Sequence, residues 1–282
     1  MDGFENWEAW QAVLATDRAR FDQRWLYEQA MCALDPRDLW DGRCVLCERD
    51  VRFEVMRAAA PADTNLRESL VCPHCRTNAR MRAGLALLRD HVPDRDAAVY
   101  ITEQASPNFV WLQGRYARAF GSEYASDPEL IANLRQYLRD LGGQGEIRCE
   151  DVTRLTFADG ELDAIATFDV LEHVPDYRAA LHEFARTLRP GGALVLTAPF
   201  LPLSRDSVER ARIAADESVE HLLPAEYHGD PLAGEGILCF HHFGWDLLDA
   251  VRAAGFAHAR MMLPWQPAYG FPSNLWTLVA VR

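Results

Sequence analysis

Four of the seven cysteines in this 282-residue chain form two closely spaced pairs. Cys44 and Cys47 are the ends of one Cys-x-x-Cys motif and Cys72 and Cys75 of another, a spacing that lets two thiolates bind one ion. Together they predict a structural zinc site, because a complete four-sulfur shell leaves no position for a catalytic water. A redox pair would account for one motif but not for two. His74, inside the second motif, could replace a cysteine, although four cysteines are the simpler ligand set.

A second group of polar side chains lies late in the chain, in EHLLPAEYHGDPLAGEGILCFHHFGWDLL. A histidine oriented by a carboxylate can take a proton from a hydroxyl group or an acidic carbon. The candidate base is therefore His221, or His228 with Asp230, and Tyr227 is a candidate for positioning a substrate. The Tyr-His-Gly-Asp-Pro stretch can equally be a turn whose side chains satisfy backbone groups. A second metal site, whose spacing follows no compact ligand pattern, would use His221, His228, His241 and His242.

The composition is that of a globular protein, with 49% hydrophobic and 25% charged residues and no low-complexity tract. Its 42 acidic and 29 basic residues give a formal net charge of -13, which repels phosphate backbones and anionic lipid surfaces. No segment reaches the roughly twenty apolar residues of a membrane span. We therefore expect a cytoplasmic protein that binds neither nucleic acid nor membranes. Cys32, Cys149 and Cys239 lack close partners and are predicted to be buried thiols.

Residues 4–34 have apolar side chains at intervals of three and four, which predicts an amphipathic helix or helix pair. Three tryptophans, Trp7, Trp10 and Trp25, share its apolar stripe. Packing on the rest of the chain is favoured over a membrane-surface helix, because the polar face mixes acids with arginines. The stripe could also cover the mouth of an active site, or contact a second copy or another protein. The second cysteine motif leads into a further helix at about 77–91.

After residue 91, short apolar strands alternate with helical segments, the pattern of a parallel sheet covered on both faces. It predicts an α/β fold with a doubly wound, Rossmann-like sheet, in which ligands bind just beyond the carboxyl ends of the strands. The last apolar runs, FAHARMMLPW and NLWTLVAVR, are expected to form a hairpin-like pair that closes the sheet. An Arg-Pro-Gly-Gly turn is expected before the fifth strand. The predicted strands are 98–103, 118–123, 145–149, 162–168 and 192–198, and the predicted helices are 107–117, 127–141, 176–189 and 245–254.

The most informative segment is CEDVTRLTFADGELDAIATFDVLEHVPDYRAALHEFARTLRPGGALVLTAPF. It has an acidic residue after the third strand, Phe-Asp at the end of the fourth, Leu-Glu-His opening a helix, and Arg-Pro-Gly-Gly before the fifth. In this ordered combination it resembles class I S-adenosylmethionine-dependent methyltransferases of the small-molecule type. The resemblance covers roughly residues 97–282, and this segment is its specific part.

The resemblance implies roles for individual residues. Glu123, at the end of the second strand, matches the acid that binds both ribose hydroxyls of the cofactor, for which a carboxylate has two acceptor oxygens. Asp151 and the backbone of Val152 match the position that contacts adenine. Asp169 matches the loop near the methionine end and the transferred methyl group. For the Leu-Glu-His tripeptide that follows, capping and packing are favoured for the glutamate, and the role of the histidine stays open.

The departure from that family is the stretch YITEQASPNF, at the first strand-to-helix turn. The family has an acid followed by Gly-x-Gly-x-Gly there, because bare backbone must approach the methionine carboxylate and the ribose. If Glu103 takes the acidic place, the glycine places fall on Ala105, Pro107 and Phe109. Ser106 and the amides that begin the helix could receive the carboxylate instead.

The expected function is S-adenosylmethionine-dependent methylation of a small molecule, such as a sugar or another secondary metabolite. A cysteine-ligated zinc module ahead of such a domain is similar in layout to enzymes that methylate nucleotide-linked sugars. The alternative is a non-catalytic or repurposed methyltransferase-like protein that has lost the cofactor and acts through protein contacts. The expected organisation is a helical segment at 1–40, a treble-clef or ribbon-like zinc module at 41–92, and a methyltransferase-like domain at 93–282 with an insertion at about 200–243.

Overall fold

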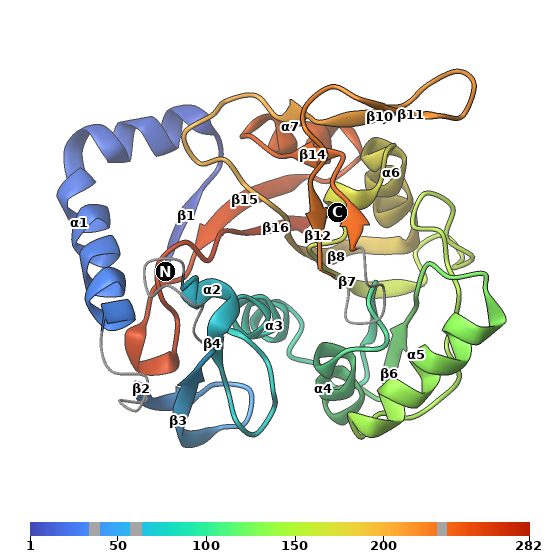
Figure 1. Cartoon of the computed structure of the whole chain (residues 1–282), viewed down its shortest axis with the longest axis horizontal. Helices are drawn as coiled ribbons and strands as arrows, with labels where there is room; N and C mark the ends of the chain where they lie inside the picture. Colours follow the sequence, from blue (N-terminus) through green and yellow to red (C-terminus); the bar gives the residue numbers. More distant parts are fainter. Residues whose placement is uncertain (34–39, 57–63, 230–235) are drawn as a thin grey trace.

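A seven-stranded mixed sheet forms the centre of the protein, as the computed structural model in Figure 1 shows for residues 1–33, 40–56, 64–229 and 236–282. Four neighbouring strands are parallel, and the other three pair antiparallel at one side. The predicted α/β sheet and its closing pair of strands are therefore confirmed. In sheet order the strands are β1 (Asp2–Phe4), β15 (His258–Leu263), β16 (Thr277–Val281), β8 (Leu188–Thr197), β7 (Leu162–Phe168), β5 (Ala98–Ile101) and β6 (Arg118–Gly121).

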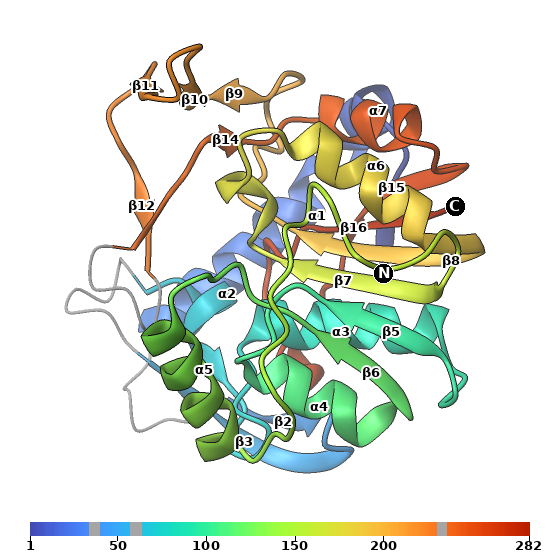
Figure 2. The same cartoon turned by 90° about the vertical axis from the view of Figure 1, so that its right-hand side faces the viewer.

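Helices cover both faces of the sheet (Figures 1 and 2). On one face a large apolar cluster joins α1, α6 and α7 to the strands, and on the other a second cluster joins α3, α4 and α5. Among the described residues, no helix has the length and apolar character needed to cross a membrane. The helices are α1 (Trp7–Ala33), α3 (Ala79–His91), α4 (Pro107–Arg115), α5 (Pro128–Asp140), α6 (Tyr177–Thr187) and α7 (Asp246–Ala253).

The order of the parallel strands reverses at β5. From β5 the chain moves outward to β6, and it then returns to form β7 on the other side of β5. At such a switch point the connections leave on opposite sides, so that a crevice opens beyond the carboxyl ends of the strands. The loops that follow β5, β6 and β7 therefore surround the position where a ligand is expected.

Three details of the sheet differ from the sequence-based expectations. The predicted strand at 145–149 is reduced to one isolated bridge, between Glu123 and Cys149. The Arg-Pro-Gly-Gly segment is not a turn before β8 but lies inside it as a bulge, because Leu162 pairs with Leu188 whereas Ala164 pairs with Ala193. The N-terminal strand β1, which extends the sheet beside β15, was not predicted.

The N-terminal helix packs on the sheet, as the favoured interpretation proposed. Trp10 is 4% exposed, and its indole nitrogen donates to Pro202 O at 2.8 Å. Asp17 interrupts the helix with non-helical angles (φ −139°, ψ 28°), which accounts for the predicted helix pair. Trp25 is 52% exposed, so the apolar stripe does not stay buried along the whole helix. Of the three other cysteines, Cys239 is buried, Cys149 is exposed contrary to the prediction, and the side chain of Cys32 lies outside the described part.

The cysteine-containing region is a small three-stranded sheet with a short helix, beside α3 (Figure 1). Its own apolar cluster continues into α3 through Ala79, Ala83 and Ala86. The predicted helix after the second cysteine motif is thus confirmed as α3, which also packs on β7 and β8. The elements of this region are β2 (Trp40–Cys44), β3 (Arg49–Val55), α2 (Leu66–Ser69) and β4 (Leu70–Val71), with the turn η3 (Pro267–Tyr269) packed against β2.

The late insertion consists of short strand pairs that lie beyond the carboxyl edge of the sheet (Figure 2). It is anchored to the turn η2 (Leu171–His173) that follows β7, because Phe240 N donates to the carbonyl of Glu172 at 2.8 Å. The paired strands are β10 (Ala211–Ile213) with β11 (Val219–His221), β12 (Tyr227–His228) with β13 (Ile237–Leu238), and β9 (Val208–Glu209) with β14 (His241–His242).

Candidate functional site

The four cysteines of the two motifs form one cluster. Their sulfurs lie within 4.8 Å of one another, with Cys44 Sγ 3.7 Å from Cys75 Sγ and Cys47 Sγ 3.8 Å from Cys72 Sγ. Zinc–sulfur distances of about 2.3 Å place the sulfurs of a tetrahedral site about 3.8 Å apart. The cluster therefore fits a zinc ion. His74 is exposed and is not part of it.

Two similar turns and several polar groups surround the four sulfurs. The residue after each motif, Glu48 or Arg76, has left-handed backbone angles (φ 55° and 60°), so the two motifs end in the same type of turn. Thr77 Oγ1 lies 3.1 Å from Cys75 Sγ. The fully buried Arg82 donates to the carbonyls of Thr77 and Gly270 at 2.8 Å, and its positive charge lies near the cysteines.

The glycine-free loop after β5 has ordinary backbone angles. Among the described non-glycine residues, those with positive φ do not include any residue from Glu103 to Phe109. The side chain of Gln104 bonds the neighbouring segment instead, donating to Glu146 O and accepting from Arg148 N, both at 2.8 Å. The side chain of Gln104 packs closely against the backbone of Gly121, where a Cβ would lie 2.8 Å from Gln104 Cγ. The loop therefore does not need glycine for its own conformation.

Glu103 and Ser106 organise the start of α4. Ser106 caps the helix, since its hydroxyl accepts from Phe109 N at 3.2 Å and donates to Glu103 O at 2.8 Å. The carboxylate of Glu103 accepts from Thr102 Oγ1 and Asn108 Nδ2, both at 3.1 Å. Burial raises the pKa of Glu103 to about 8. This carboxyl group is therefore largely protonated at neutral pH.

Glu123 and Asp151 lie next to this loop. Glu123 Oε1 accepts from Ala105 N at 2.5 Å, and Glu123 O accepts from Glu150 N at 3.0 Å, which brings Asp151 to the same edge of the sheet. Asp151 closes a small turn by accepting from Thr153 N at 2.9 Å and from Thr153 Oγ1 at 2.7 Å. Four of the six predicted cofactor residues, Glu103, Ser106, Glu123 and Asp151, thus gather beyond β5 and β6, and Val152 follows them with its side chain packed on the core.

Asp169 receives two arginines that the sequence did not single out. Arg67 Nη2 lies 3.1 and 3.2 Å from its two carboxylate oxygens, Arg80 Nε lies 3.1 Å from Oδ2, and Thr197 Oγ1 donates at 2.8 Å. Burial acts to raise the pKa of Asp169, but the charges of Arg80 and Arg67 outweigh it and leave this pKa below its ordinary value. Arg67 belongs to α2 and Arg80 to α3, so the cysteine-containing region reaches the edge of the sheet.

A polar cluster brings the insertion to η2. His228 Nδ1 lies 3.5 Å from Glu172 Oε1, and His228 Nε2 lies 3.1 Å from Glu226 Oε1. Glu172 is fully buried, which raises its pKa. Of the capping and packing favoured from the sequence, its burial agrees with packing, and η2 has no side-chain cap. His173 Nδ1 lies 2.8 Å from Leu238 O, and its Nε2 is 3.8 Å from Glu172 Oε1.

The other predicted catalytic residues lie outside this cluster. His221 is exposed on β11, where it pairs with Ala211. Tyr227 is 55% exposed beside His228. Asp230 lies outside the described residues. The carboxylates beside His228 are those of Glu172 and Glu226. Glu172 belongs to the Leu-Glu-His tripeptide, but its contact with His228 was not predicted, and Glu226 was not among the candidate residues.

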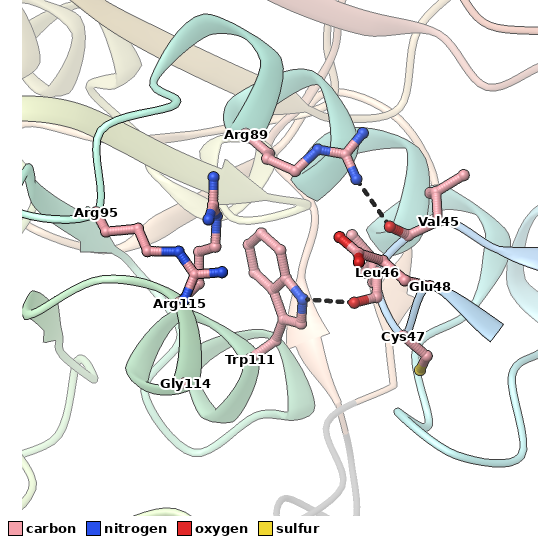
Figure 3. A pocket seen from close by; sticks show the side chains of 9 residues that line it. All are labelled: Val45, Leu46, Cys47, Glu48, Arg89, Arg95, Trp111, Gly114 and Arg115. Carbon is pink, nitrogen blue, oxygen red and sulfur yellow. Dashed lines mark hydrogen bonds between the residues drawn. The ribbon is translucent and has the colours of Figure 1, made fainter.

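A cavity of about 390 Å³ lies elsewhere, between the first cysteine motif and the end of α4 (Figure 3). Arg89 donates to Val45 O at 2.7 Å, and the indole nitrogen of Trp111 approaches Leu46 O at 3.4 Å. Of the predicted site residues that the structure describes, only Cys47 lines it. These contacts attach the cysteine motif to the helices, and the cavity is separate from the carboxyl edge where the predicted cofactor residues gather.

Comparison with known proteins gives a family for the centre of the chain. Residues 108–196 match the family described as methyltransferase domain. This confirms, for that segment, the resemblance seen in the sequence. Because the match spans less than a third of the chain, it identifies a domain type rather than an activity of the whole protein.

Individual relatives point in the same direction over short stretches. A ubiquinone biosynthesis O-methyltransferase of Xanthomonas axonopodis is 33% identical over 103 residues, which are 36% of this chain and 41% of that protein. A demethylmenaquinone methyltransferase of Mycolicibacterium vanbaalenii is 52% identical over 46 residues, 16% of this chain and 20% of that protein. The chain thus spans about two fifths or less of the length of these curated relatives.

Solved structures with a partial likeness include 1,6-didemethyltoxoflavin-N1-methyltransferase of Burkholderia thailandensis, bound to 1,6-didemethyltoxoflavin and S-adenosylhomocysteine. It is 20% identical with a TM-score of 0.45, over 72% of this chain and 78% of that one. A methyltransferase of Mesorhizobium loti is 16% identical with a TM-score of 0.46, over 74% of this chain and all of that one.

Proposed function

We propose that this protein is an S-adenosylmethionine-dependent methyltransferase that acts on a small molecule. The observation that carries the proposal is the methyltransferase-domain match of residues 108–196, which includes β6 and β7 and the loops that follow them. Glu123, Asp151 and Asp169, assigned from the family resemblance, lie in these loops, beyond the carboxyl edge of the sheet.

The residues beyond β5 and β6 suit an adenosyl group. Glu123 would accept the ribose hydroxyls, with Ala105 N fixing one of its oxygens. Asp151 and the backbone of Val152 would contact adenine. Ser106, Glu103 and the first amides of α4 would face the methionine end, where a helix N-terminus favours a carboxylate. When bound, the cofactor supplies an electrophilic methyl group from its sulfonium.

Asp169 would act as a fixed anion at the methionine end. Its contacts with Arg67, Arg80 and Thr197 hold the carboxylate in one orientation. Such pre-orientation matters in methyl transfer, because the acceptor, the methyl carbon and the sulfur must lie in line. Arg67 and Arg80 are thus positioning residues in this proposal.

His173 is the best-placed proton acceptor of the cluster. Only a donor can bond the carbonyl of Leu238, so Nδ1 is assigned the hydrogen and Nε2 keeps its lone pair. Glu172 near Nε2 would stabilise the imidazolium that forms. His228 is less suitable, because both of its nitrogens face carboxylates. Exposed Tyr227 remains a candidate for substrate contact, and His221 and Asp230 remain predictions from the sequence.

Calorimetric titration with S-adenosylmethionine and S-adenosylhomocysteine tests the proposal. We expect binding by the wild-type protein and at least a tenfold loss of affinity in Glu123→Ala, since two hydrogen bonds to a charged acceptor are removed. Glu129→Ala, which removes an exposed acid at the start of α5, is the matched control and should bind normally. Absence of heat and of thermal stabilisation at millimolar ligand would favour the non-catalytic alternative.

We further propose that the four-cysteine cluster binds a structural zinc ion. The sulfur separations and the paired turns support this. Zinc there would fix the start of α3 and, through it, Arg80 beside Asp169. The zinc would therefore support the cofactor site without touching it.

A further inference from the structure

A second group of metal-ligand side chains occurs in the insertion. The ligand atoms of Glu226, His228, Cys239 and His242 all lie within 4.8 Å of one another. His228 Nε2 and His242 Nε2 converge on the same oxygen, Glu226 Oε1, at 3.1 and 3.0 Å. Nitrogen and oxygen ligands about 2.0 to 2.1 Å from a tetrahedral zinc ion lie about 3.3 to 3.4 Å apart. The two Nε2–Oε1 separations are slightly shorter than this, and the other ligand-atom separations are no longer than 4.8 Å, so small side-chain shifts would form a complete coordination shell.

The four side chains lie in, or directly beside, strands that are too short to be stable alone: His228 and His242 belong to β12 and β14, Glu226 precedes β12 and Cys239 follows β13. β12, β13 and β14 have two residues each, and they belong to two separate strand pairs. Cys239 N donates to Glu226 O at 2.8 Å, which places the thiol beside the carboxylate. A segment with so little regular structure commonly depends on a metal or another cross-link for its conformation.

Glu172 provides an independent observation. Its side chain is fully buried, and within the described part of the chain neither carboxylate oxygen has a hydrogen-bond partner. A buried carboxylate left in this state is costly. His228 Nδ1, 3.5 Å from Glu172 Oε1, is the group that could satisfy it. A histidine that ligates a metal through one nitrogen generally donates its other N–H to a carboxylate or carbonyl, which fixes its orientation.

We propose that Glu226, His228, Cys239 and His242 bind one divalent transition-metal ion, with Glu172 orienting His228. Two imidazoles, a thiolate and a carboxylate are ligand types that zinc accepts, whereas magnesium and calcium require oxygen. Four protein ligands make this a structural ion, which would join β12 and β13 to β14 and hold the insertion against η2.

This set differs from the four histidines considered from the sequence. His241 Nε2 instead lies 3.1 Å from Pro175 O, and His221 is exposed on β11. The competing account of the cluster is a polar network without metal, in which Glu226 bridges the two histidines and Arg210 Nη2, 3.0 Å from its second oxygen. The two accounts differ in metal content.

Elemental analysis of protein purified without added metal distinguishes them. The double variant His228→Gln with His242→Gln should contain one zinc ion per chain fewer than the wild type. His221→Gln, an exposed histidine of the same insertion, is the matched control and should lose none. Equal zinc contents in the wild type and the folded double variant would overturn the proposal.

Cys239→Ser provides a second test if the double variant does not fold. This near-isosteric change should weaken one zinc site at least tenfold, measured by competition with a chromophoric chelator, whereas exposed Cys149→Ser should leave both affinities unchanged. Unaltered zinc affinity in Cys239→Ser would contradict the assignment. Neither experiment uses methyl transfer, so the result is independent of the proposed function.

Discussion

At the scale of single residues, the candidate site depends on carboxylates in three different environments. Glu103 is held by uncharged donors and its pKa is raised by burial. Asp169 is equally buried, but its contacts with two arginines keep it ionised. Glu172 is fully buried, and burial raises its pKa more than the nearby imidazoles of His228, at 3.5 Å, and His173, at 3.8 Å, lower it. The partners of each acid, rather than its depth, therefore decide its charge.

Glu103→Gln tests the first of these environments. The native pKa of about 8 lies above the ordinary glutamate pKa of 4.5, so the native state binds the proton more tightly than the unfolded state. The free energy of unfolding should therefore fall as pH rises from about 4.5 to about 8, and level off above. The variant should lose this slope and gain on the order of 5 kcal/mol over the wild type at pH 9, at about 1.4 kcal/mol for each pKa unit between 4.5 and about 8.

Urea unfolding of both proteins at pH 5 and pH 9 measures this effect. Glu129→Gln is the control, because its side chain is exposed on α5. A difference between wild type and Glu103→Gln that is the same at both pH values would contradict the raised pKa.

At the scale of elements, α3 connects the cysteine cluster with the proposed cofactor site. Its N-terminus follows the second cysteine motif, and its Arg80 contacts Asp169. Its apolar side chains Leu85, Leu87 and Leu88 belong to the core beneath the sheet. Disruption of the cysteine cluster should therefore disturb the cofactor site through α3, which holds Arg80 beside Asp169.

Cys44→Ser combined with Cys72→Ser tests this link. The variant should contain about one zinc ion per chain fewer than the wild type and should unfold at a lower temperature, because metal binding contributes to folding. Cys149→Ser is the control, since that thiol is exposed. Atomic emission and thermal unfolding make the measurements. An unchanged zinc content in the double variant would argue against the four-cysteine site.

At the scale of the whole molecule, the N-terminus completes the fold. β1 adds the outermost strand to the sheet, and Phe4 and Trp10 pack with Trp245 and Trp276 from the end of the chain. The first residues and the last are thus parts of one apolar cluster. The helix stripe therefore packs mainly in the intramolecular core, and Trp25, Leu26 and Tyr27 of the same helix are exposed.

Trp10→Ala measures how much this closure contributes. Removing a large buried aromatic side chain should lower the free energy of unfolding by about 3 to 5 kcal/mol. Trp25→Ala, on the same helix but 52% exposed, should cost less than about 1 kcal/mol. Urea unfolding of the two variants gives the comparison. A similar loss of unfolding free energy in both variants would show that the burial of Trp10 in the core does not account for the effect.

The sequence by itself determined most strands and helices of the central sheet domain and the grouping of the four cysteines. The alternation of apolar strands and helices predicts the bounds of β5, β7 and α3 to within a few residues, because the spacing of buried apolar side chains along a strand or helix can be seen in a short stretch of sequence. Two Cys-x-x-Cys motifs likewise bring their sulfurs together over short distances. The strand expected at 145–149 failed because only one residue of it pairs with its neighbour.

The tertiary structure alone decided which charges meet. Arg67 lies 102 residues from Asp169, and Glu172 contacts His228 from a different part of the fold. No short-range pattern of the sequence predicts such pairs, because they depend on how α2, η2 and the short strands of the insertion pack on the sheet. The physical reason is that apolar burial is specified residue by residue, whereas the partner of a buried charge is selected by the finished fold.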